Sequence, residues 1–181
     1  AVSVTAGAVL DLNGITMTNT NALTLNGTGI STNGALINSS STGATYAGLI
    51  TLGSASSIIG GTGTIAITNA GTITGATYAL TLGGAQGGSI TSVIGTTSGT
   101  VTKQDTGTWT LSGNNTYTGA TTISAGTLAI THANALGTTA GATTVASGAA
   151  LSISNGITVA EPITISGTGV SSGGALRFTS G

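Results

Sequence analysis

The sequence predicts an all-β protein, a parallel β-helix (β-solenoid) of about eight turns without long helices. Apolar residues alternate with Thr, Ser or Asn in short runs, and this period of two is typical of strands with one buried face. Turn signals containing Gly or Asn separate the runs, so the chain bends every few residues. Stacked turns of about 20–25 residues suit this pattern, because each turn completes its core against its neighbours. The clearest runs are Leu23–Leu25, Ile65–Ile67, Leu80–Leu82, Trp109–Leu111, Leu128–Ile130, Leu151–Ile153 and Ile163–Ile165.

Charged side chains are nearly absent from the chain. They make up 3% of the 181 residues, against roughly 25% in a typical domain, and the net charge is −1. Such a composition has no electrostatic footprint for nucleic acid or for an anionic membrane surface. The absence of Cys excludes a disulfide scaffold and a Cys-ligated zinc site. An apolar fraction of 39% and a mean hydropathy of +0.46 argue against a disordered chain.

Membrane and targeting signals are not recognisable in the sequence. No run approaches the ~18 apolar residues of a transmembrane helix. The first ten residues, AVSVTAGAVL, lack the basic start and apolar core of a signal peptide. We therefore expect a mature segment, or a piece cut from a longer protein.

Internal repeats favour the solenoid over a β-sandwich, the main alternative with short strands and frequent turns. Residues 23–41 align with residues 163–181 at an offset of 140, with nine of 19 positions identical. The stretches that begin at Gly7 and Gly148 also match. We interpret the chain as one β-solenoid segment, with a tandem unit of about 140 residues (about 4–144) followed by the start of a second copy (about 145–181). A shorter repeat, TGATYA, occurs at 42–47 and at 74–79.

The stretch Gly107–Thr131 reads GTWTLSGNNTYTGATTISAGTLAIT. It resembles the autotransporter-associated β-strand repeat, the passenger-associated repeat of bacterial autotransporters and giant surface adhesins. The resemblance implies a right-handed β-helix passenger, displayed extracellularly at the cell surface of a Gram-negative bacterium. It also implies a C-terminal membrane translocator, which is not part of these residues. The residues that define the structural motif are Trp109, Leu111, Gly113, Asn115, Tyr117, Gly119, Gly126 and Leu128.

The alternation within this stretch also predicts local structure. Trp109 and Leu111 have the same parity and are expected to point into the core. Gly113–Asn115 is expected to form a turn, since Asn tolerates left-handed backbone and bonds locally. Tyr117 is expected at a corner, with its hydroxyl reaching solvent or backbone. Gly126 is expected to let the chain turn into the following strand.

Few side chains are able to perform chemistry, so we predict no catalytic, cofactor-binding or metal-binding residues and no enzyme. His132, the one histidine, is expected on a loop or at the surface. Lys103 and Asp105 are expected to form an exposed pair of negligible stability. The carboxylates are too few and too scattered for glycoside hydrolysis or a metal site. They belong to Asp11, Asp105 and Glu161.

These observations predict a structural segment of an extracellular stalk or adhesin. A neutral, repetitive surface has little charge repulsion, so we expect homotypic association, lateral or end to end, into filaments or cell–cell contacts. The alternative is a glycan-binding module that uses exposed tyrosines. Tyr46, Tyr78 and Tyr117 are the candidates, and the first two lie in the repeated TGATYA. A third hypothesis, an enzyme, would need a pocket that holds His132 with a carboxylate.

Overall fold

All pairings between the described strands are parallel, which is the pattern of a solenoid and not of an antiparallel sandwich. The computed structural model describes residues 1–154 and 156–179. Asn155, Ser180 and Gly181 lie outside the described residues, so the turn signal at Asn155 and the last two positions of the predicted second copy do too.

Two long parallel sheets face each other along the rod. The first follows the order β1, β4, β7, β10, β13, β15, β17, β19, with β2 and β5 at its side, and the second runs from β3 to β20. The strands of the first sheet are β1 (Val2–Val4), β2 (Leu10–Asp11), β4 (Leu23–Gly27), β5 (Leu36–Asn38), β7 (Ile50–Gly60), β10 (Leu80–Gly83), β13 (Val101–Lys103), β15 (Thr121–Ile123), β17 (Thr143–Val145) and β19 (Ile163–Ile165). Those of the second are β3 (Thr16–Met17), β6 (Ala44–Tyr46), β8 (Ile65–Ile67), β11 (Gly87–Ile90), β14 (Thr108–Leu111), β16 (Thr127–Ile130), β18 (Ala150–Ser154) and β20 (Leu176–Thr179).

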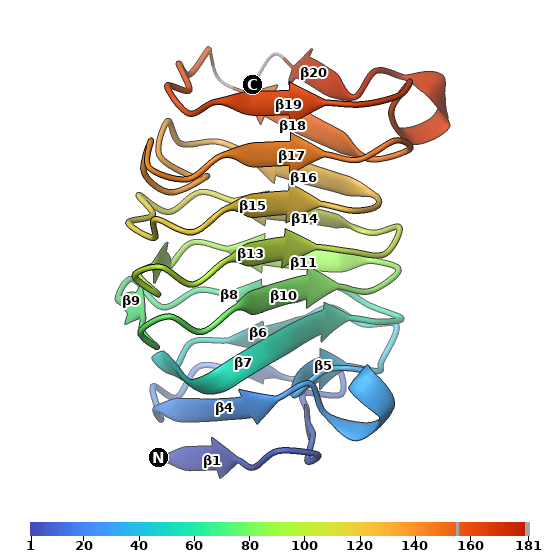
Figure 1. Ribbon diagram of the computed structural model, residues 1–181. Helices are drawn as coiled ribbons and strands as arrows, with labels where there is room; N and C mark the ends of the chain where they lie inside the picture. The colour runs from blue at the N-terminus through green and yellow to red at the C-terminus, as the bar shows by residue number, and fades with distance from the viewer. Residues whose placement is uncertain (155, 180–181) are drawn as a thin grey trace.

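The chain climbs the rod as a right-handed coil of eight turns, as predicted. In Figure 1 the near strands point to the right while the chain rises from the N-terminus at the bottom, and it returns along the far side. The first sheet contributes one rung per turn along its main path, from β1 to β19. A third, two-stranded sheet of β9 (Thr72–Ile73) and β12 (Val93–Ile94) closes part of the remaining side.

The described residues contain only two helical segments, both short 3₁₀ turns. They are η1 (Ile30–Thr32), between β4 and β5, and η2 (Val170–Ser172), between β19 and β20. Both protrude from the right-hand edge of the rod in Figure 1. No helix in the described part of the chain is long and apolar enough to cross a membrane.

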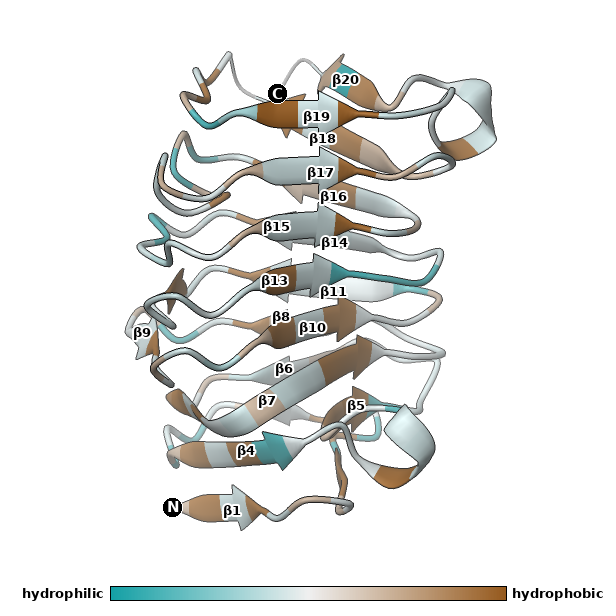
Figure 2. Ribbon diagram, in the orientation of Figure 1, coloured by the Kyte–Doolittle hydropathy of each residue, from teal (hydrophilic) through white to brown (hydrophobic). Residues whose placement is uncertain are grey.

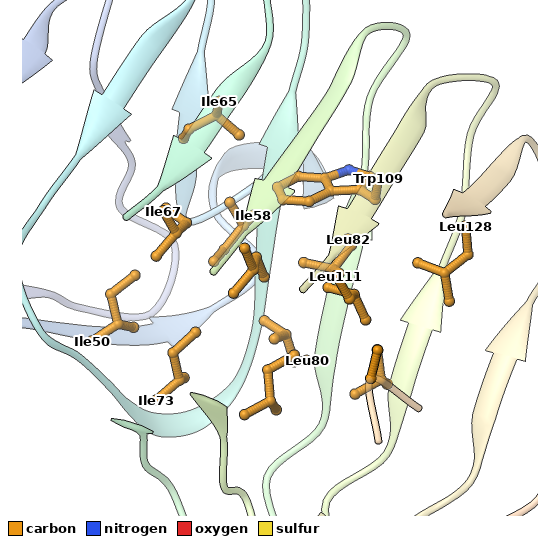
Figure 3. Close-up of a cluster of buried hydrophobic side chains, with 14 of the residues drawn as sticks. Ile50, Ile58, Ile65, Ile67, Ile73, Leu80, Leu82, Trp109, Leu111 and Leu128 are labelled. Carbon is orange, nitrogen blue, oxygen red and sulfur yellow. The ribbon is translucent and has the colours of Figure 1, made fainter. Parts of the chain in front are cut away.

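The core is a continuous apolar column between the sheets. In most strands away from the two ends of the rod, alternate residues are buried, as the period of two predicts, and residues of successive turns stack in register. In Figure 2 brown, hydrophobic segments lie on the strands, whereas the loops are mostly pale. Figure 3 shows side chains from both sheets meeting in the interior, among them Leu82, Trp109, Leu111 and Leu128, all of which are buried.

The outer face of the first sheet carries a column of threonines. Thr residues at one position of β10, β13, β15, β17 and β19 are direct register partners along the rod. At a strand spacing of about 4.8 Å they form a regular row of hydroxyl groups. The row consists of Thr81, Thr102, Thr122, Thr144 and Thr164.

Candidate functional site

The repeat-like stretch Gly107–Thr131 forms one full turn of the solenoid and enters the next. It begins with β14 in the second sheet, passes through β15 in the first and ends with β16, which pairs directly with β14. Its side chains can therefore connect the turn below with the turn above.

Trp109 and Leu111 point into the core, as predicted, and both are fully buried. The indole Nε1 of Trp109 donates a hydrogen bond to the carbonyl oxygen of Gly83 at 2.9 Å. This bond satisfies the polar atom of a buried tryptophan. Leu128, the last motif residue, is the register partner of Trp109 on the next turn and is also buried.

Asn115 holds three turns together, a role that the sequence reasoning missed. Its Oδ1 accepts a hydrogen bond from the Ile94 amide at 2.8 Å, and its Nδ2 donates one to the Ala135 carbonyl at 2.6 Å. These residues lie one turn before and one turn after Asn115. The left-handed backbone that we expected for this segment is not used, since no asparagine of Gly113–Asn115 has a positive φ. The side-chain amide bonds to the neighbouring turns and not locally.

Tyr117 lies inside the rod, and its hydroxyl reaches neither solvent nor backbone, contrary to the prediction. It forms a 2.7 Å hydrogen bond with Oγ1 of Thr121, which is also buried. Burial raises the pKa of Tyr117 well above its usual range, and the negative charge of Glu161 adds to the rise. The phenol therefore stays protonated.

Glu161 carries a buried carboxyl group next to this cluster. Its Oε1 accepts a hydrogen bond from Thr143 Oγ1 at 2.7 Å, whereas its Oε2 is buried without a partner. Burial raises the pKa of Glu161 and the Thr143 hydrogen bond lowers it, with a net upward shift. Sequence reasoning placed Glu161 among scattered carboxylates and gave no reason to expect it inside.

The motif glycines lie where the backbones of adjacent turns touch. A Cβ at Gly113 would overlap the carbonyl oxygen of Ser92, and one at Gly119 would overlap that of Gly99. Gly126 has a φ of +64° and lies against the backbone of Asp105. At all three positions a larger residue would push the turns apart.

Lys103 is fully buried, so the predicted exposed pair with Asp105 is wrong. Its side chain points into the core between Leu82 and Ile123, its register partners. The ammonium group donates to the carbonyl oxygens of Gln104, Asp105 and Ala125 at 2.7, 2.8 and 3.0 Å. Burial lowers the pKa of Lys103 to about 8, although the nearby negative charge of Asp105 opposes the shift. Oδ2 of Asp105 instead accepts a hydrogen bond from the Gly84 amide at 2.7 Å.

The histidine lies on a loop, as predicted. Its Nδ1 accepts a hydrogen bond from the Asn134 amide at 3.1 Å, and His132 itself is partly exposed. Among the described residues no three His, Asp or Glu side chains gather in a group that could hold a metal ion. A hollow of about 530 Å³ beside η1 is lined by Ile37, Ile59, Ala85 and polar neighbours, none of them His, Asp or Glu.

The candidate tyrosines for glycan binding do not share a face. Tyr46 and Tyr117 are buried, and Tyr78 alone is exposed, at 38%. The two TGATYA copies adopt different structures, because residues 44–46 of the first form β6 whereas the second contains a turn with Thr77 at a φ of +68°. Tyr46 Oη donates to the Asn21 carbonyl at 2.6 Å from within the core.

Comparison with known families identifies the central part of the chain. Residues 101–130 match the model of the passenger-associated-transport-repeat, which confirms the resemblance of Gly107–Thr131 to that repeat. Searches of curated proteins and of solved structures find no match. The matched residues include β13, β14, β15 and β16 and therefore the side chains of Trp109, Asn115 and Tyr117, whereas Gly83, Ile94 and Ala135, to which Trp109 and Asn115 bond, lie outside the match.

Proposed function

We propose that this chain is a non-enzymatic structural segment of an autotransporter-like passenger, displayed outside a Gram-negative cell as an elongated stalk or adhesin. The observation that carries the proposal is the passenger-associated-transport-repeat at residues 101–130, embedded in an uninterrupted solenoid. Each further turn lengthens the rod by about 4.8 Å without changing its cross-section. The hydrogen bonds between turns run along the rod axis, so they bear tension applied to its ends.

The surface supports the accompanying proposal of homotypic association. Two of the five charged side chains, Lys103 and Glu161, lie inside the rod, so the exterior carries only Asp11, Asp105 and Arg177. A row of threonine hydroxyls faces outward on the first sheet. Two such surfaces meet without charge repulsion and can exchange hydrogen bonds with each other.

Surface labelling of intact bacteria that produce the native protein tests the display of the segment. An antibody against the segment should bind intact cells, and added proteinase K, which does not require Lys or Arg at the cleavage site, should remove the signal while a periplasmic marker survives. A signal that appears only after the outer membrane is opened would contradict surface display.

Sedimentation velocity of the purified chain tests its association. We expect concentration-dependent oligomers whose size does not change with salt, since charge pairing would weaken as salt screens it. A monomer at all concentrations would contradict homotypic association. Oligomers that dissociate in salt would show that charge pairing, and not the neutral surface, holds them together.

Tyr78 supports glycan binding as a second candidate function, since its exposed ring could stack on a sugar. On a glycan array, Tyr78→Ala should abolish any binding that the native chain has. Leu49→Ala is the matched control, because Leu49 is also 38% exposed. Equal loss in both variants, or no binding by the native chain, would remove this candidate.

A further inference from the structure

The strand pairing at the C-terminal end of the rod repeats the pairing at its N-terminal end. β17 and β19 pair in the register of β1 and β4, and β18 and β20 pair in the register of β2 and β5. The corresponding positions are 140 or 141 residues apart, as in the sequence repeat. The equivalent pairs are Val2–Leu23 with Thr143–Ile163, Val4–Leu25 with Val145–Ile165, and Leu10–Leu36 with Leu151–Leu176.

The two 3₁₀ turns are also equivalent. Gly29 and Gly169, which precede them, have φ of 76° and 78°, and Ser31 and Ser171 within them both have φ of 51°. The closing hydrogen bond from the amide of Gly34 to the Thr28 carbonyl is 2.8 Å long, and its counterpart from Gly174 to Thr168 is 2.9 Å. The unit β4–η1–β5 therefore recurs as β19–η2–β20.

The two units differ in what lies on them. β7 covers the first, with Ile50 opposite Leu23, Leu52 opposite Leu25 and Ile58 opposite Leu36. Leu25 and Leu36 are consequently fully buried, whereas Ile165, the counterpart of Leu25, is 49% exposed. Phe178, on an inward position of β20, is 77% exposed.

We propose that the edge formed by β19, η2 and β20 is an acceptor for a strand with the sequence of β7, supplied by a further copy of the repeating unit. The occupant would place its copies of Ile50, Leu52 and Ile58 on Ile163, Ile165 and Leu176. This inference concerns the register in which units join, and it holds wherever the protein is displayed.

The geometry of β7 suits this edge. β2 and β5 join the first sheet only through β7, and their counterparts β18 and β20 belong to the second sheet, so an occupant of this edge has to pair with strands of both sheets, as β7 pairs with β4 and β5. β7 already breaks register at this point, where Leu25 and Gly27 pair with Leu52 and Ser56. Arg177, the counterpart of Ile37, folds back onto η2, where Nη2 donates to Val170 O at 2.5 Å and Nε to Gly174 O at 3.1 Å. It therefore leaves the edge open.

The acceptor can be tested by extending the full chain after Gly181 with a second copy of residues 42–67. The extension begins where the repeat would continue, because residue 181 corresponds to residue 41. We expect the melting temperature to rise by roughly 5 °C, and the amides of β19 and β20 to exchange more slowly. The control extension carries Ile50→Asp, Leu52→Asp and Ile58→Asp in the appended copy only. Equal melting temperatures for the native chain and both extensions would overturn the proposal.

A disulfide test reports the register separately from stability. The chain contains no cysteine, so Thr164→Cys and Thr51→Cys in the appended copy give one defined pair, equivalent to the register pair Thr24–Thr51. Neighbouring strands about 4.8 Å apart are within disulfide reach. A pair shifted by two residues, with Gly53→Cys in the appended copy, is not. We expect oxidation of the first pair only, and equal oxidation of both pairs would indicate a loose tail and contradict the proposal.

Discussion

The indole of Trp109 donates its hydrogen bond to the carbonyl oxygen of Gly83, 26 residues earlier in the chain. This contact links the strand β14 of the second sheet to the end of β10 in the first. It therefore joins the two faces of the rod at one edge, and it ties the segment that matches the passenger-associated-transport-repeat to the turn before it.

Trp109→Phe should lower the free energy of unfolding by about 2 kcal/mol. The substitution removes the indole donor and part of a fully buried ring, and both changes cost stability. Urea unfolding should be followed by far-ultraviolet circular dichroism, because the variant has lost the tryptophan fluorescence that would otherwise report unfolding. Thr108→Ser, at an exposed position on the same strand, should change the value by less than about 0.5 kcal/mol.

Asn115→Leu should cost about 3 kcal/mol, because it leaves the buried Ile94 amide and Ala135 carbonyl without partners. Asn114→Leu is the matched control, since Asn114 is adjacent and exposed. Chemical denaturation of both variants measures the two losses in the free energy of unfolding. Similar losses in the two would mean that the bridge through Asn115 contributes nothing specific.

Lys103 should make the protein more stable as the solution becomes alkaline. Its pKa is about 8 in the folded protein, against an ordinary value of 10.5, so the unfolded chain binds more protons between these values. The free energy of unfolding should therefore rise with pH, by up to about 2 kcal/mol between pH ~8 and ~10. Above this range the buried tyrosines, whose pKa values are raised, oppose the trend. Lys103→Met should flatten the pH profile of unfolding, and a slope that survives in this variant would have another origin.

Glu161→Gln should stabilise the protein at neutral pH by about 1 kcal/mol, because it keeps an acceptor for Thr143 and removes a buried charge. The pKa of Glu161 is raised, so its stabilising contribution is complete below the ordinary value of 4.5 and is lost as the pH rises through the folded pKa. The gain should thus disappear in acid. Thermal unfolding at neutral pH and in acid compares Glu161→Gln with Glu161→Ala, which lacks the acceptor and should gain less stability.

Gly29→Ala and Gly169→Ala should each cost several kcal/mol, since a Cβ would overlap the carbonyl oxygen of Gly34 or Gly174 at a positive φ. Gly148→Ala separates the cost of the steric overlap from the cost of the positive φ. Its φ is also positive, at 84°, but a Cβ there meets nothing within 4 Å. It should cost only about 1 kcal/mol, as measured by thermal unfolding, and a loss as large as that of Gly29→Ala would assign the whole effect to the backbone.

Local alternation and internal repeats were enough to predict the architecture. The parity of Trp109 and Leu111 fixed their burial, and the matching residues around Gly29 and Gly169 produced matching 3₁₀ turns. The repeated TGATYA did not give repeated structure, because β6 is held in its sheet by β3 and β8 whereas the second copy lies at a corner. Tertiary pairing outweighs so short a local signal.

The polar interior was not predictable by residue type. Lys103 has the parity of the buried Val101, which was a usable signal, but a lysine is ordinarily expected outside. Three carbonyl groups from two successive turns accept hydrogen bonds from its ammonium group and so compensate for its burial. No pattern in the sequence predicts that these carbonyl groups lie there. The same holds for Asn115 and Glu161, whose partners come from neighbouring turns of the coil.

The carbonyl cage around Lys103 also bears on proteolysis. Trypsin-like enzymes cleave after Lys and Arg, and the chain has two such residues. One is sealed inside the rod, and the other, Arg177, has its guanidinium folded back onto η2. The folded segment therefore offers such proteases almost no cleavage site over its whole length. A tryptic digest of the unfolded chain gives fragments ending at Lys103 and Arg177, which are too long for routine peptide mass spectrometry. This composition therefore makes the folded segment resistant to trypsin-like proteases in particular, and it yields few peptides of a length suited to mass-spectrometric identification.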